Sequence, residues 1–587
     1  MVRIGIAVVV WLAVSGCVQA QSTPVILVSV DTLRADHLSS YGYRRIRTPN
    51  LDSFAENGTT FTSIASQIPL TLPSHTSLFT STYPFVTSVE ENAERVPAGL
   101  VTLASVLRSR GYKTAAFIGS SLLDQRYGLD QGFDFYDSPF HVSSDAAENP
   151  YDVRVRRDGA LVVRSAEQWL GANRAQPVFA FVHLFDLHTP YSRPTAIRDR
   201  PTVTGYDAEL EYVDQVLGRF RQALIKQGWW DRSLVVLLAD HGESLEEHGE
   251  TSHGYFIYAS TLGVPLLIHW PSGAPPRPSR VAEPGGLIDV APTILAALSV
   301  PSPPSFQGRN LMARGETAGH AVYAESLYTF DAFHWAALRS LRVGDFKYIE
   351  APRPELYNLR DDPREQIDLI RTNTAKAREL RLRLGKLLAR YASNQAAPVR
   401  DTSPETTAAL RSLGYLSGGA RRLPGGTGPD PKDRLAEYRL YEKALRALYT
   451  QQVEAAILDF RRLLAEDSKN NLARYYLGES YLKALKTEAA LREWETALSA
   501  DTSDATAAEA IGEVWLEREN YPKAQHYFEL AVAAAPRDYT AAFKLGVAEE
   551  HQGLLESAVR HLEDACKLVP ESAECKRELD ALRKKIK

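Results

Sequence analysis

The pattern of apolar and polar positions divides the chain into two parts of different architecture. From Pro24 to about Ala351, short apolar runs alternate with amphipathic stretches. This alternation is typical of strands that cross over through helices into a largely parallel sheet. The strand candidates are Pro24–Val30, Lys113–Ile118, Val178–Leu184, Leu234–Ala239 and Val264–His269. We therefore predict an α/β fold, a mostly parallel sheet sandwiched by helices.

The last part of the chain repeats itself with a period of 34 residues. Small residues recur in phase at Gly478, Gly512 and Gly546, and at Ala456, Ala490, Ala524 and Ala558. Bulky residues follow at Phe460, Trp494, Phe528 and Leu562, and helix-ending positions fall at Asp467, Asp501, Pro536 and Pro570. Small residues let paired helices approach closely, and a large side chain fills the gap between them. The pattern resembles tetratricopeptide repeats and predicts an all-α solenoid of four units, with a capping helix from Ala573 to about Lys585.

A segment rich in glycine and proline, from Gly418 to Pro431, separates the two parts. Such a composition does not hold regular structure. We predict an α/β domain at residues 24–395, a linker at 396–433 and repeats at 434–587. A flexible linker predicts that the repeats recruit a protein or peptide partner without shaping the site of the α/β domain.

The repeats offer candidate residues for a partner-binding groove on their first helices. These candidates are Arg474, Tyr475 and Lys544. Trp494 and Phe528 occupy positions that pack the core of the repeats, so we do not assign them to the groove.

The N-terminus has the features of a targeting segment. Arg3 precedes an apolar run from Ile4 to Val14 that is too short to span a bilayer. Residues 1–20 are therefore predicted to be a signal peptide, and the protein to be extracytoplasmic, either periplasmic or secreted. Ala20 is a small residue that suits ordinary signal cleavage, whereas Val14-Ser15-Gly16-Cys17 resembles a lipobox whose cysteine would be lipid-anchored to a membrane. Both alternatives remain open.

Composition narrows the class of protein. A chain of 587 residues is too long for one compact core, which predicts two or more domains. A formal net charge of -5 without a basic tract argues against nucleic-acid binding. Three cysteines are too few for a disulfide scaffold or a zinc cluster. Cys566 and Cys575 flank the turn at Pro570, so they either form a bridge or are two small buried residues.

Candidate chemistry follows the predicted strands. Asp31 follows the first strand, Asp186 and His188 follow the third, and Asp240 and His241 follow the fourth. Ligands of open α/β sheets bind beyond the carboxyl ends of the strands, so these side chains are expected in one pocket. Two carboxylates and an imidazole, from Asp31, Asp240 and His241, can hold a divalent cation. The imidazole shifts the preference towards Zn²⁺ or Mn²⁺ over Ca²⁺ or Mg²⁺.

The segment Thr71–Pro84, TLPSHTSLFTSTYP, resembles the active-site signature of the sulfatase family of the alkaline-phosphatase superfamily. That signature reads Cys or Ser, any residue, Pro, Ser, Arg, and continues to Tyr-Pro. Further family-like segments follow in collinear order at Val30–Asp36, Thr48–Asp52, Ala239–Glu243, Asp345–Ile349 and Glu355–Leu359. The resemblance covers roughly residues 24–370 and implies a sulfatase-like fold with a metal-dependent ester hydrolase site.

Two departures from the signature affect the expected activity. Thr71 stands at the position that sulfatases convert to formylglycine, and its β-methyl group prevents that conversion. His75 stands where the signature has Arg. The loop is similar to that of nucleotide pyrophosphatase/phosphodiesterases, which implies that Thr71 is itself the nucleophile. A weakly acidic hydroxyl needs activation, which a bound cation supplies, so Thr71 joins Asp31, Asp240 and His241 as a predicted metal ligand.

The resemblance also implies roles for other pocket residues. His188 matches a family histidine that contacts the ester and leaving group, which makes it the candidate general acid. His253 lies near the position of a family lysine that this chain lacks. It either acts on substrate oxygens or joins Asp186 and His188 at a second metal ion. His75 and Asn92 are the candidate substrate-binding residues, whereas His183, within a strand, is expected to be structural.

Three functions are compatible with these residues. The first is in-line attack by Thr71 on a phosphate mono- or diester, with water hydrolysing the phosphothreonine. The alternative is hydrolysis of a sulfate ester, which carries less charge than a phosphate monoester. The third is an interaction scaffold whose hydrolase domain is inactive.

Overall fold

A computed structural model of the protein describes residues 23–92, 94–140, 155–191, 205–313, 319–392, 428–536, 538–568 and 572–586. The predicted signal peptide, the lipobox and residues 396–427 of the predicted linker lie outside these ranges. Within the described ranges, no helix has the length and apolar character needed to cross a membrane.

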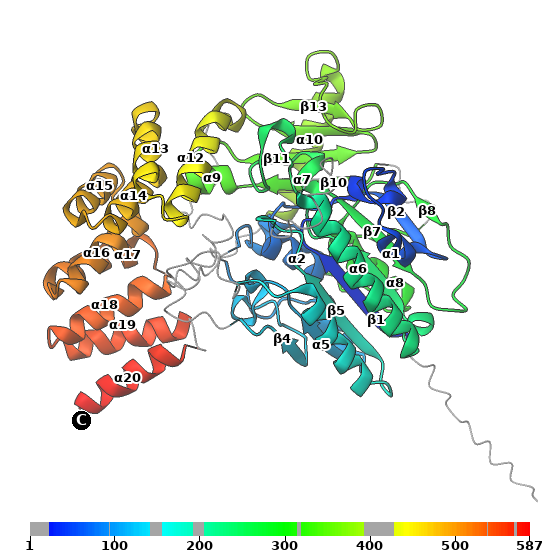
Figure 1. The fold of residues 1–587 in the computed structure, drawn as a ribbon, viewed down its shortest axis with the longest axis horizontal. Helices are drawn as coiled ribbons and strands as arrows, with labels where there is room; N and C mark the ends of the chain where they lie inside the picture. The colour runs from blue at the N-terminus through cyan, green and yellow to red at the C-terminus, as the bar shows by residue number, and fades with distance from the viewer. Residues whose placement is uncertain are drawn as a thin grey trace, which may run out of the picture.

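The α/β domain is built on a nine-stranded sheet in the order β4-β3-β5-β1-β6-β7-β2-β8, with β9 paired to β2 (Figure 1). Its strands are β1 (Val25–Val30), β2 (Thr59–Ala65), β3 (Lys113–Phe117), β4 (Phe135–Asp137), β5 (Val178–Leu184), β6 (Leu234–Leu238), β7 (Gly263–His269), β8 (Arg280–Val281) and β9 (Gly285–Gly286). The five strands from β4 to β6 in this order are parallel, whereas β7 runs antiparallel to both β6 and β2. The predicted mostly parallel sheet is confirmed, and β7 is its main exception.

Helices cover both faces of the sheet. On β5, Phe181 contacts Phe79 of α2 (Thr71–Thr80), with ring centroids 4.9 Å apart. Leu184 of the same strand lies beside Gly159 at the start of α5 (Gly159–Ala172). Residues 181 and 184 point to opposite faces of a strand, so α2 and α5 pack on opposite faces. Every residue of β1, β5 and β6 is consequently buried, which explains why these strands are almost continuously apolar.

Other helices complete this domain. They are α1 (Pro49–Asp52), α3 (Pro84–Thr87), α4 (Leu103–Ser109), α6 (Gly205–Lys226), α7 (Ala259–Leu262), α8 (Val290–Ala297) and α9 (Tyr328–Phe333). Among them α6 packs against α5 and α1, and α8 contacts α2.

A second, antiparallel sheet follows, which the hydrophobic pattern did not predict. It contains β10 (Ala321–Ser326), β11 (Leu338–Val343), β12 (Phe346–Glu350) and β13 (Glu355–Asn358), and α10 (Thr374–Tyr391) packs against it. Buried Lys347 ties this sheet to the main body, because its Nζ donates to the carbonyl of Ile257 (2.6 Å) and pairs with Glu365 (2.7 Å).

The repeats form four helix pairs and a final helix. They are α12 (Leu435–Tyr449), α13 (Val453–Glu466), α14 (Asn471–Lys483), α15 (Thr487–Ala500), α16 (Ala505–Glu517), α17 (Tyr521–Ala534), α18 (Tyr539–His551), α19 (Leu555–Leu568) and α20 (Ala573–Ile586). Trp494 and Phe528 are buried, as predicted. A β-carbon on Gly478 would lie 2.3 Å from Trp494 Nε1, so the glycine is what admits the indole.

The candidate groove residues do not present free side chains. Tyr475 is only 9% exposed and packs near Trp494, so its assignment to a groove is wrong. Tyr475 lies on α14, the first helix of its repeat, but its ring packs near Trp494 on α15, the second helix of the same repeat. Arg474 pairs with Glu493 (3.0 Å), and Lys544 pairs with Glu509 (3.8 Å) and Glu513.

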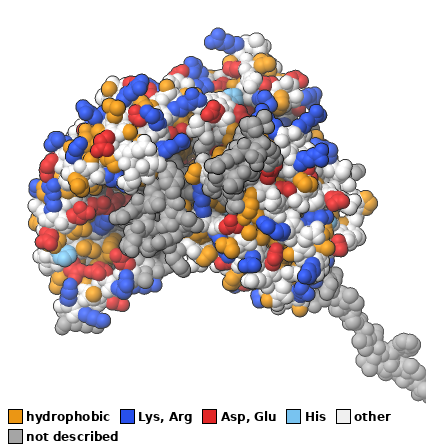
Figure 2. Space-filling model, in the orientation of Figure 1, with side chains coloured by type: hydrophobic (Ala, Val, Ile, Leu, Met, Phe, Trp, Pro, Cys, Tyr) orange, Lys and Arg blue, Asp and Glu red, His pale blue; other side chains and the backbone are white. Residues whose placement is uncertain are grey.

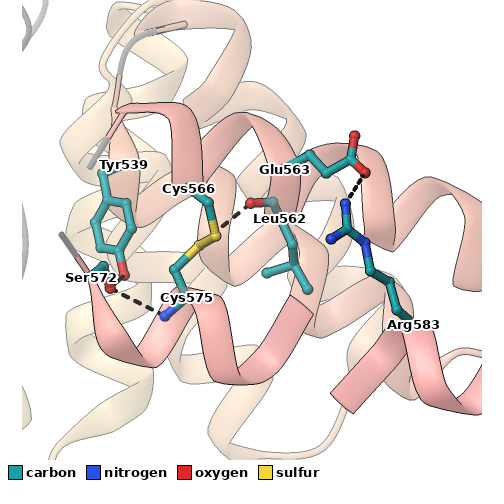
Figure 3. Close-up of a disulfide and its surroundings, with 7 residues drawn as sticks. All are labelled: Tyr539, Leu562, Glu563, Cys566, Ser572, Cys575 and Arg583. Carbon is teal, nitrogen blue, oxygen red and sulfur yellow. Dashed lines mark hydrogen bonds and ion pairs between the residues drawn. A yellow bond between two sulfur atoms is a disulfide. The ribbon is translucent and has the colours of Figure 1, made fainter. Parts of the chain in front are cut away.

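A disulfide joins Cys566 of α19 to Cys575 of α20 (Figure 3). The sequence left open whether these cysteines form a bridge, and the structure shows the bridge. Next to it, the Cys575 N–H donates to Ser572 Oγ (3.1 Å), and Arg583 of α20 pairs with Glu563 of α19 (2.8 Å). The capping helix is therefore fixed to the last repeat covalently and by polar contacts.

The first repeat packs directly on the α/β domain (Figure 1). One apolar cluster includes Tyr255 and Phe333 of the α/β domain together with Tyr438 and Tyr441 of α12. The last linker residues are also fixed, since the Pro429 carbonyl accepts a hydrogen bond from the N–H of Ala336 (2.9 Å). The predicted flexibility of the linker is therefore wrong for residues 428–431, which lie at a junction where aromatic side chains of the two units bury each other.

Charged side chains of both signs lie on the face of the molecule drawn in Figure 2. Figure 2 shows basic and acidic groups intermixed over the visible face. This intermixing agrees with the small formal net charge of -5.

Candidate active site

The carboxyl ends of β1 and β6 and the start of α2 meet at one point. Strand β1 pairs in parallel with β6, so Asp31 and Asp240, which follow these strands, emerge side by side. Thr71 is the first residue of α2. Its Oγ1 donates to Asp31 Oδ2 (3.2 Å) and lies 3.4 Å from His241 Nε2. The structure thus brings together all four predicted metal ligands, and all four are fully buried.

The chemistry of these side chains fits a divalent cation. Asp31 Oδ1 and Asp240 Oδ2 are buried without a hydrogen-bond partner among the described residues, and the ligand atoms of Asp31, Asp240 and His241 lie within 4.8 Å of one another. Burial raises the pKa of Asp31 to about 6, and burial together with the Asp31 charge raises the pKa of Asp240. Two adjacent buried carboxylates are costly unless a positive charge offsets them. A divalent cation would supply that charge.

The imidazole of His241 has the tautomer that a metal ligand requires. Its Nδ1 donates to the carbonyl of Gly242 (2.9 Å), which leaves the Nε2 lone pair directed towards Thr71. A hydrogen bond of this kind fixes both the tautomer and the ring orientation of metal-binding histidines.

His75 lies one helical turn after Thr71 on α2. Its Nδ1 donates to the carbonyl of Thr71 (2.8 Å), and its Nε2 accepts from Ser29 Oγ (3.0 Å). Both ring nitrogens are therefore used within the protein. The contacts in this structure support a role in holding the first turn of α2, while the predicted contact with substrate remains a prediction.

Asn92 lies at the N-terminal end of α2. Its Oδ1 accepts from the N–H of Leu72 (2.9 Å), and its Nδ2 is buried without a partner among the described residues. The amide is thus oriented so that its N–H₂ group is available next to Thr71. Helix N-termini also favour negative charge, so this end of α2 suits an ester anion.

Two further histidines stand over the cluster. The His253 ring lies 4.4 Å from that of His241 and 5.0 Å from that of His188, measured between centroids. His253 Nδ1 pairs with Glu243 Oε1 (2.8 Å), and His188 Nδ1 donates to the carbonyl of Thr189 (2.6 Å). Burial lowers the pKa of His253 to about 4 and lowers that of His188 well below its usual value. Both imidazoles therefore favour the neutral form.

The second predicted metal set is not assembled. Asp186 Oδ1 accepts from the N–H of Gly159 (3.2 Å), which directs the carboxylate to the start of α5. The groupings in the described chain that could hold an ion are Asp31–Asp240–His241 and His75–His183–Asp240. Neither includes Asp186, His188 or His253. The structure thus brings His188 and His253 together without Asp186.

Sequence reasoning missed two residues of this site. His183 was expected to be structural, yet its Nε2 lies 3.5 Å from Asp31 Oδ2, and neither ring nitrogen has a hydrogen-bond partner in the described part of the chain. Glu243 belongs to the Asp-His-Gly-Glu segment, but only the structure shows it bound to His253. Burial raises the pKa of Glu243 to about 8. The signal in the sequence was that His183 is a polar residue within an otherwise apolar strand.

Comparisons with protein families cover most of the described chain. The family described as Sulfatase matches residues 23–300, and the family described as N-sulphoglucosamine sulphohydrolase, C-terminal, matches residues 247–393. Tetratricopeptide repeat matches residues 441–505, 479–524 and 510–573.

Curated relatives are distant in sequence. The chain is 24% identical over 327 residues to the Ulvan-active sulfatase of Formosa agariphila. This match covers 49% of this chain and 64% of that protein. It is 23% identical to the Uncharacterized sulfatase YidJ of Escherichia coli, over 59% of this chain and 82% of that protein. It is 26% identical to Lipoteichoic acid synthase 2 of Bacillus subtilis, over 37% of this chain and 34% of that protein. The chain therefore spans only part of these relatives.

Solved structures share the fold. The crystal structure of Ps i-CgsB in complex with k-i-k-neocarrahexaose aligns with a TM-score of 0.54 and 19% identity, over 68% of this chain and 98% of that chain. Phosphonate Monoester Hydrolase of Agrobacterium radiobacter aligns with a TM-score of 0.51 and 20% identity, over 65% of this chain and 98% of that chain. The family matches therefore place a sulfatase-like domain ahead of tetratricopeptide repeats, and the strand order and the Asp31–Thr71–Asp240–His241 cluster agree with this order.

Proposed function

We propose that the chain is a metal-dependent hydrolase of sulfate or phosphate esters with Thr71 as its nucleophile. The observation that carries this proposal is the placement of Thr71 Oγ1 between Asp31 Oδ2 (3.2 Å) and His241 Nε2 (3.4 Å). A hydroxyl at the N-terminus of a helix, next to a cation site, is arranged for in-line attack on an ester anion.

Asp31, Asp240, His241 and Thr71 would hold the metal ion, which when bound lowers the pKa of the threonine hydroxyl. The ligand set of two carboxylates and an imidazole supports Zn²⁺ or Mn²⁺ over Ca²⁺ or Mg²⁺. During attack the protein's own groups orient the ester. The helix N-terminus and the Asn92 Nδ2 face its oxygens, and His75 fixes the Thr71 carbonyl.

His188 and His253 are placed to assist the leaving group. His253 lies against His241 (4.4 Å between centroids) and His188 lies against His253 (5.0 Å), and the carboxylate of Glu243 orients His253 through Nδ1. In neutral His188 the Nδ1 proton is already donated to the Thr189 carbonyl, so Nε2 must take up a proton before His188 acts as general acid. After that proton passes to the leaving oxygen, Nε2 can accept one from the water that releases Thr71. His188 remains our candidate general acid, with His253 beside it.

Sulfate esters are the first candidate substrates. Named relatives include an ulvan-active sulfatase and a steryl-sulfatase, and the matching families are described as sulfatases. The site agrees with this choice, because burial lowers the pKa of His253 to about 4 and that of His188 well below its usual value. Neutral imidazoles offset little negative charge, which suits a monoanionic ester such as a sulfate monoester.

A phosphodiester is the second candidate, because it also carries a single negative charge. The specific observation in its favour is Thr71 itself, which cannot become formylglycine. The fold similarity to a phosphonate monoester hydrolase points in the same direction. A dianionic phosphate monoester fits the neutral histidines least well.

The deciding experiment measures kcat/KM for an aryl sulfate, a phosphodiester and a phosphate monoester side by side. The purified, metal-loaded protein should prefer a monoanionic ester, and Thr71→Ala should lose at least about a thousandfold in turnover, because it removes the nucleophile. The Thr71→Ala protein must retain its metal and its melting behaviour as a control. Turnover above a few per cent of wild type in that variant would refute Thr71 as nucleophile.

Location and partners are further proposals. The disulfide between Cys566 and Cys575 supports an oxidising, extracytoplasmic compartment. The repeats support a protein or peptide partner.

A further inference from the structure

The loop that carries His253 is held from outside by the first repeat helix. Thr251 Oγ1 donates to Glu442 Oε2 of α12 (2.6 Å), and the Gly249 carbonyl accepts from Arg439 Nε of the same helix (2.8 Å). Residues 249 and 251 directly precede His253, so two hydrogen bonds from α12 fix the approach to this histidine.

The chain beyond His253 is held in the same way. The Tyr255 hydroxyl donates to the carbonyl of Pro431 (2.5 Å), and the Tyr255 ring lies 4.2 Å from that of Tyr438. Tyr438 in turn donates to Glu442 Oε1 (2.9 Å), so one glutamate serves both the loop and the aromatic contact. The loop is therefore anchored to the repeats on both sides of His253.

Packing at this junction is tight. Gly249 has a positive φ of +82°, and a β-carbon there would lie 2.3 Å from Leu435 Cδ2. Inside the loop, Glu250 accepts from the N–H groups of Tyr255 (2.8 Å) and Phe256 (3.3 Å). The inner face of the loop then presents His253 to Glu243 (2.8 Å). A displacement of α12 would therefore be passed to His253.

The far end of the repeats also reaches a loop of the site. Arg95 donates to the carbonyl of Leu568 at the end of α19 (3.3 Å). Arg95 stands three residues after Asn92 in the sequence. The repeats thus contact the α/β domain near both His253 and Asn92, and they curve alongside it in Figure 1.

We propose that the repeat unit is a working part of the active site, in which Glu442 and Arg439 of α12 are positioning residues for His253. The hydrogen bonds of these two residues keep the 249–253 loop in the conformation that places His253 beside His241 and His188. A ligand that moves α12 would consequently alter turnover. The activity readout of this inference rests on the proposed function, whereas its structural readout does not.

The test uses the full-length protein. Glu442→Ala removes the acceptor for Thr251 and is expected to lower kcat between about tenfold and about a hundredfold, the range reached when a catalytic group is misplaced by about 1 Å. Metal content should stay at the wild-type value. Glu442→Gln keeps an oxygen acceptor and should restore most of the activity. The matched control is Glu454→Ala, an exposed glutamate on the neighbouring helix α13, and it should behave as wild type.

A second readout needs no substrate. Hydrogen exchange of residues 244–256, measured by mass spectrometry, should be at least about threefold faster in Glu442→Ala than in wild type or Glu454→Ala, because the loop loses an anchor. Thr251→Val removes the same hydrogen bond from the loop side and should reproduce both effects, which keeps the test valid if Glu442→Ala does not fold.

Unchanged exchange and unchanged kcat in the two variants would overturn the positioning role. Full activity of Thr71→Ala would instead refute the proposed function, and faster exchange in Glu442→Ala would still support the positioning role. The two failures are therefore distinguishable.

Discussion

Buried ionisable side chains define the site at the scale of single residues. Asp31 and Asp240 are carboxylates without solvent, and His183 and His241 stand next to them. Burying these carboxylates lowers the stability of the fold unless an opposite charge neutralises them. Asp31 Oδ1 and Asp240 Oδ2, which find no hydrogen-bond donor within the described ranges, therefore indicate a site built around a cation.

His183 is predicted to contribute to metal affinity. Its Nε2 lies 3.5 Å from Asp31 Oδ2, close enough to bind the ion directly or to orient the carboxylate. His183→Gln should weaken metal binding by about tenfold to a hundredfold, as loss of supporting groups does at other sites. Competition with a chromophoric chelator measures this affinity. The control is His269→Gln, a buried histidine stacked on Trp230 outside the site, and equal losses in both variants would contradict the role of His183.

Some of these site residues could be predicted from the sequence and others could not. Asp31, Asp240 and His241 were predictable, because each follows a strand and strand ends converge at one edge of a sheet. His183 was not, because its proximity to Asp31 depends on β5 pairing with β1, where Ser29 lies opposite His183. The order of strands in a sheet is a property of the whole fold, which a single strand does not reveal.

Secondary-structure elements explain how the site and the repeats are shaped. The strands β1, β3, β5, β6 and β7 matched their predicted ranges to within a residue at either end, because each is a buried apolar run. The antiparallel sheet from β10 to β13 escaped prediction, since its strands, such as β11 (LRSLRV) and β12 (FKYIE), show neither a continuous apolar run nor a strict alternation of polar and apolar residues. In the repeats, small residues decide how closely the helices pack.

Two glycines provide a matched test of repeat packing. Gly478 in α14 faces Trp494, and a β-carbon there would lie 2.3 Å from the indole nitrogen, so Gly478→Ala should destabilise the repeats by about 1–3 kcal/mol. A β-carbon on Gly385 in α10 would meet no described atom within 4 Å, so Gly385→Ala should stabilise its helix by about 0.5–1 kcal/mol. Thermal unfolding followed by circular dichroism compares them. Equal effects of the two substitutions would contradict the packing argument.

At the scale of the whole molecule, the two units share an apolar junction. Tyr438 and Tyr441 of α12 pack against Tyr255 and Phe333, so the first repeat is buried by the α/β domain rather than by a preceding repeat. The sequence did not predict this contact, because aromatic residues at these positions read equally well as the internal core of a repeat. Glycine and proline in the linker signalled flexibility, yet residues 428–431 are fixed by hydrogen bonds at the junction.

The central claim is that Thr71 forms the covalent intermediate, and trapping that intermediate tests it most directly. The metal-loaded protein is mixed with its preferred ester, quenched in acid within one turnover and digested, and the peptide containing residue 71 is analysed by tandem mass spectrometry. We predict a sulfuryl or phosphoryl group on Thr71, absent from Thr71→Ala and from protein stripped of metal. An adduct on another residue, or full turnover by Thr71→Ala, would contradict the account.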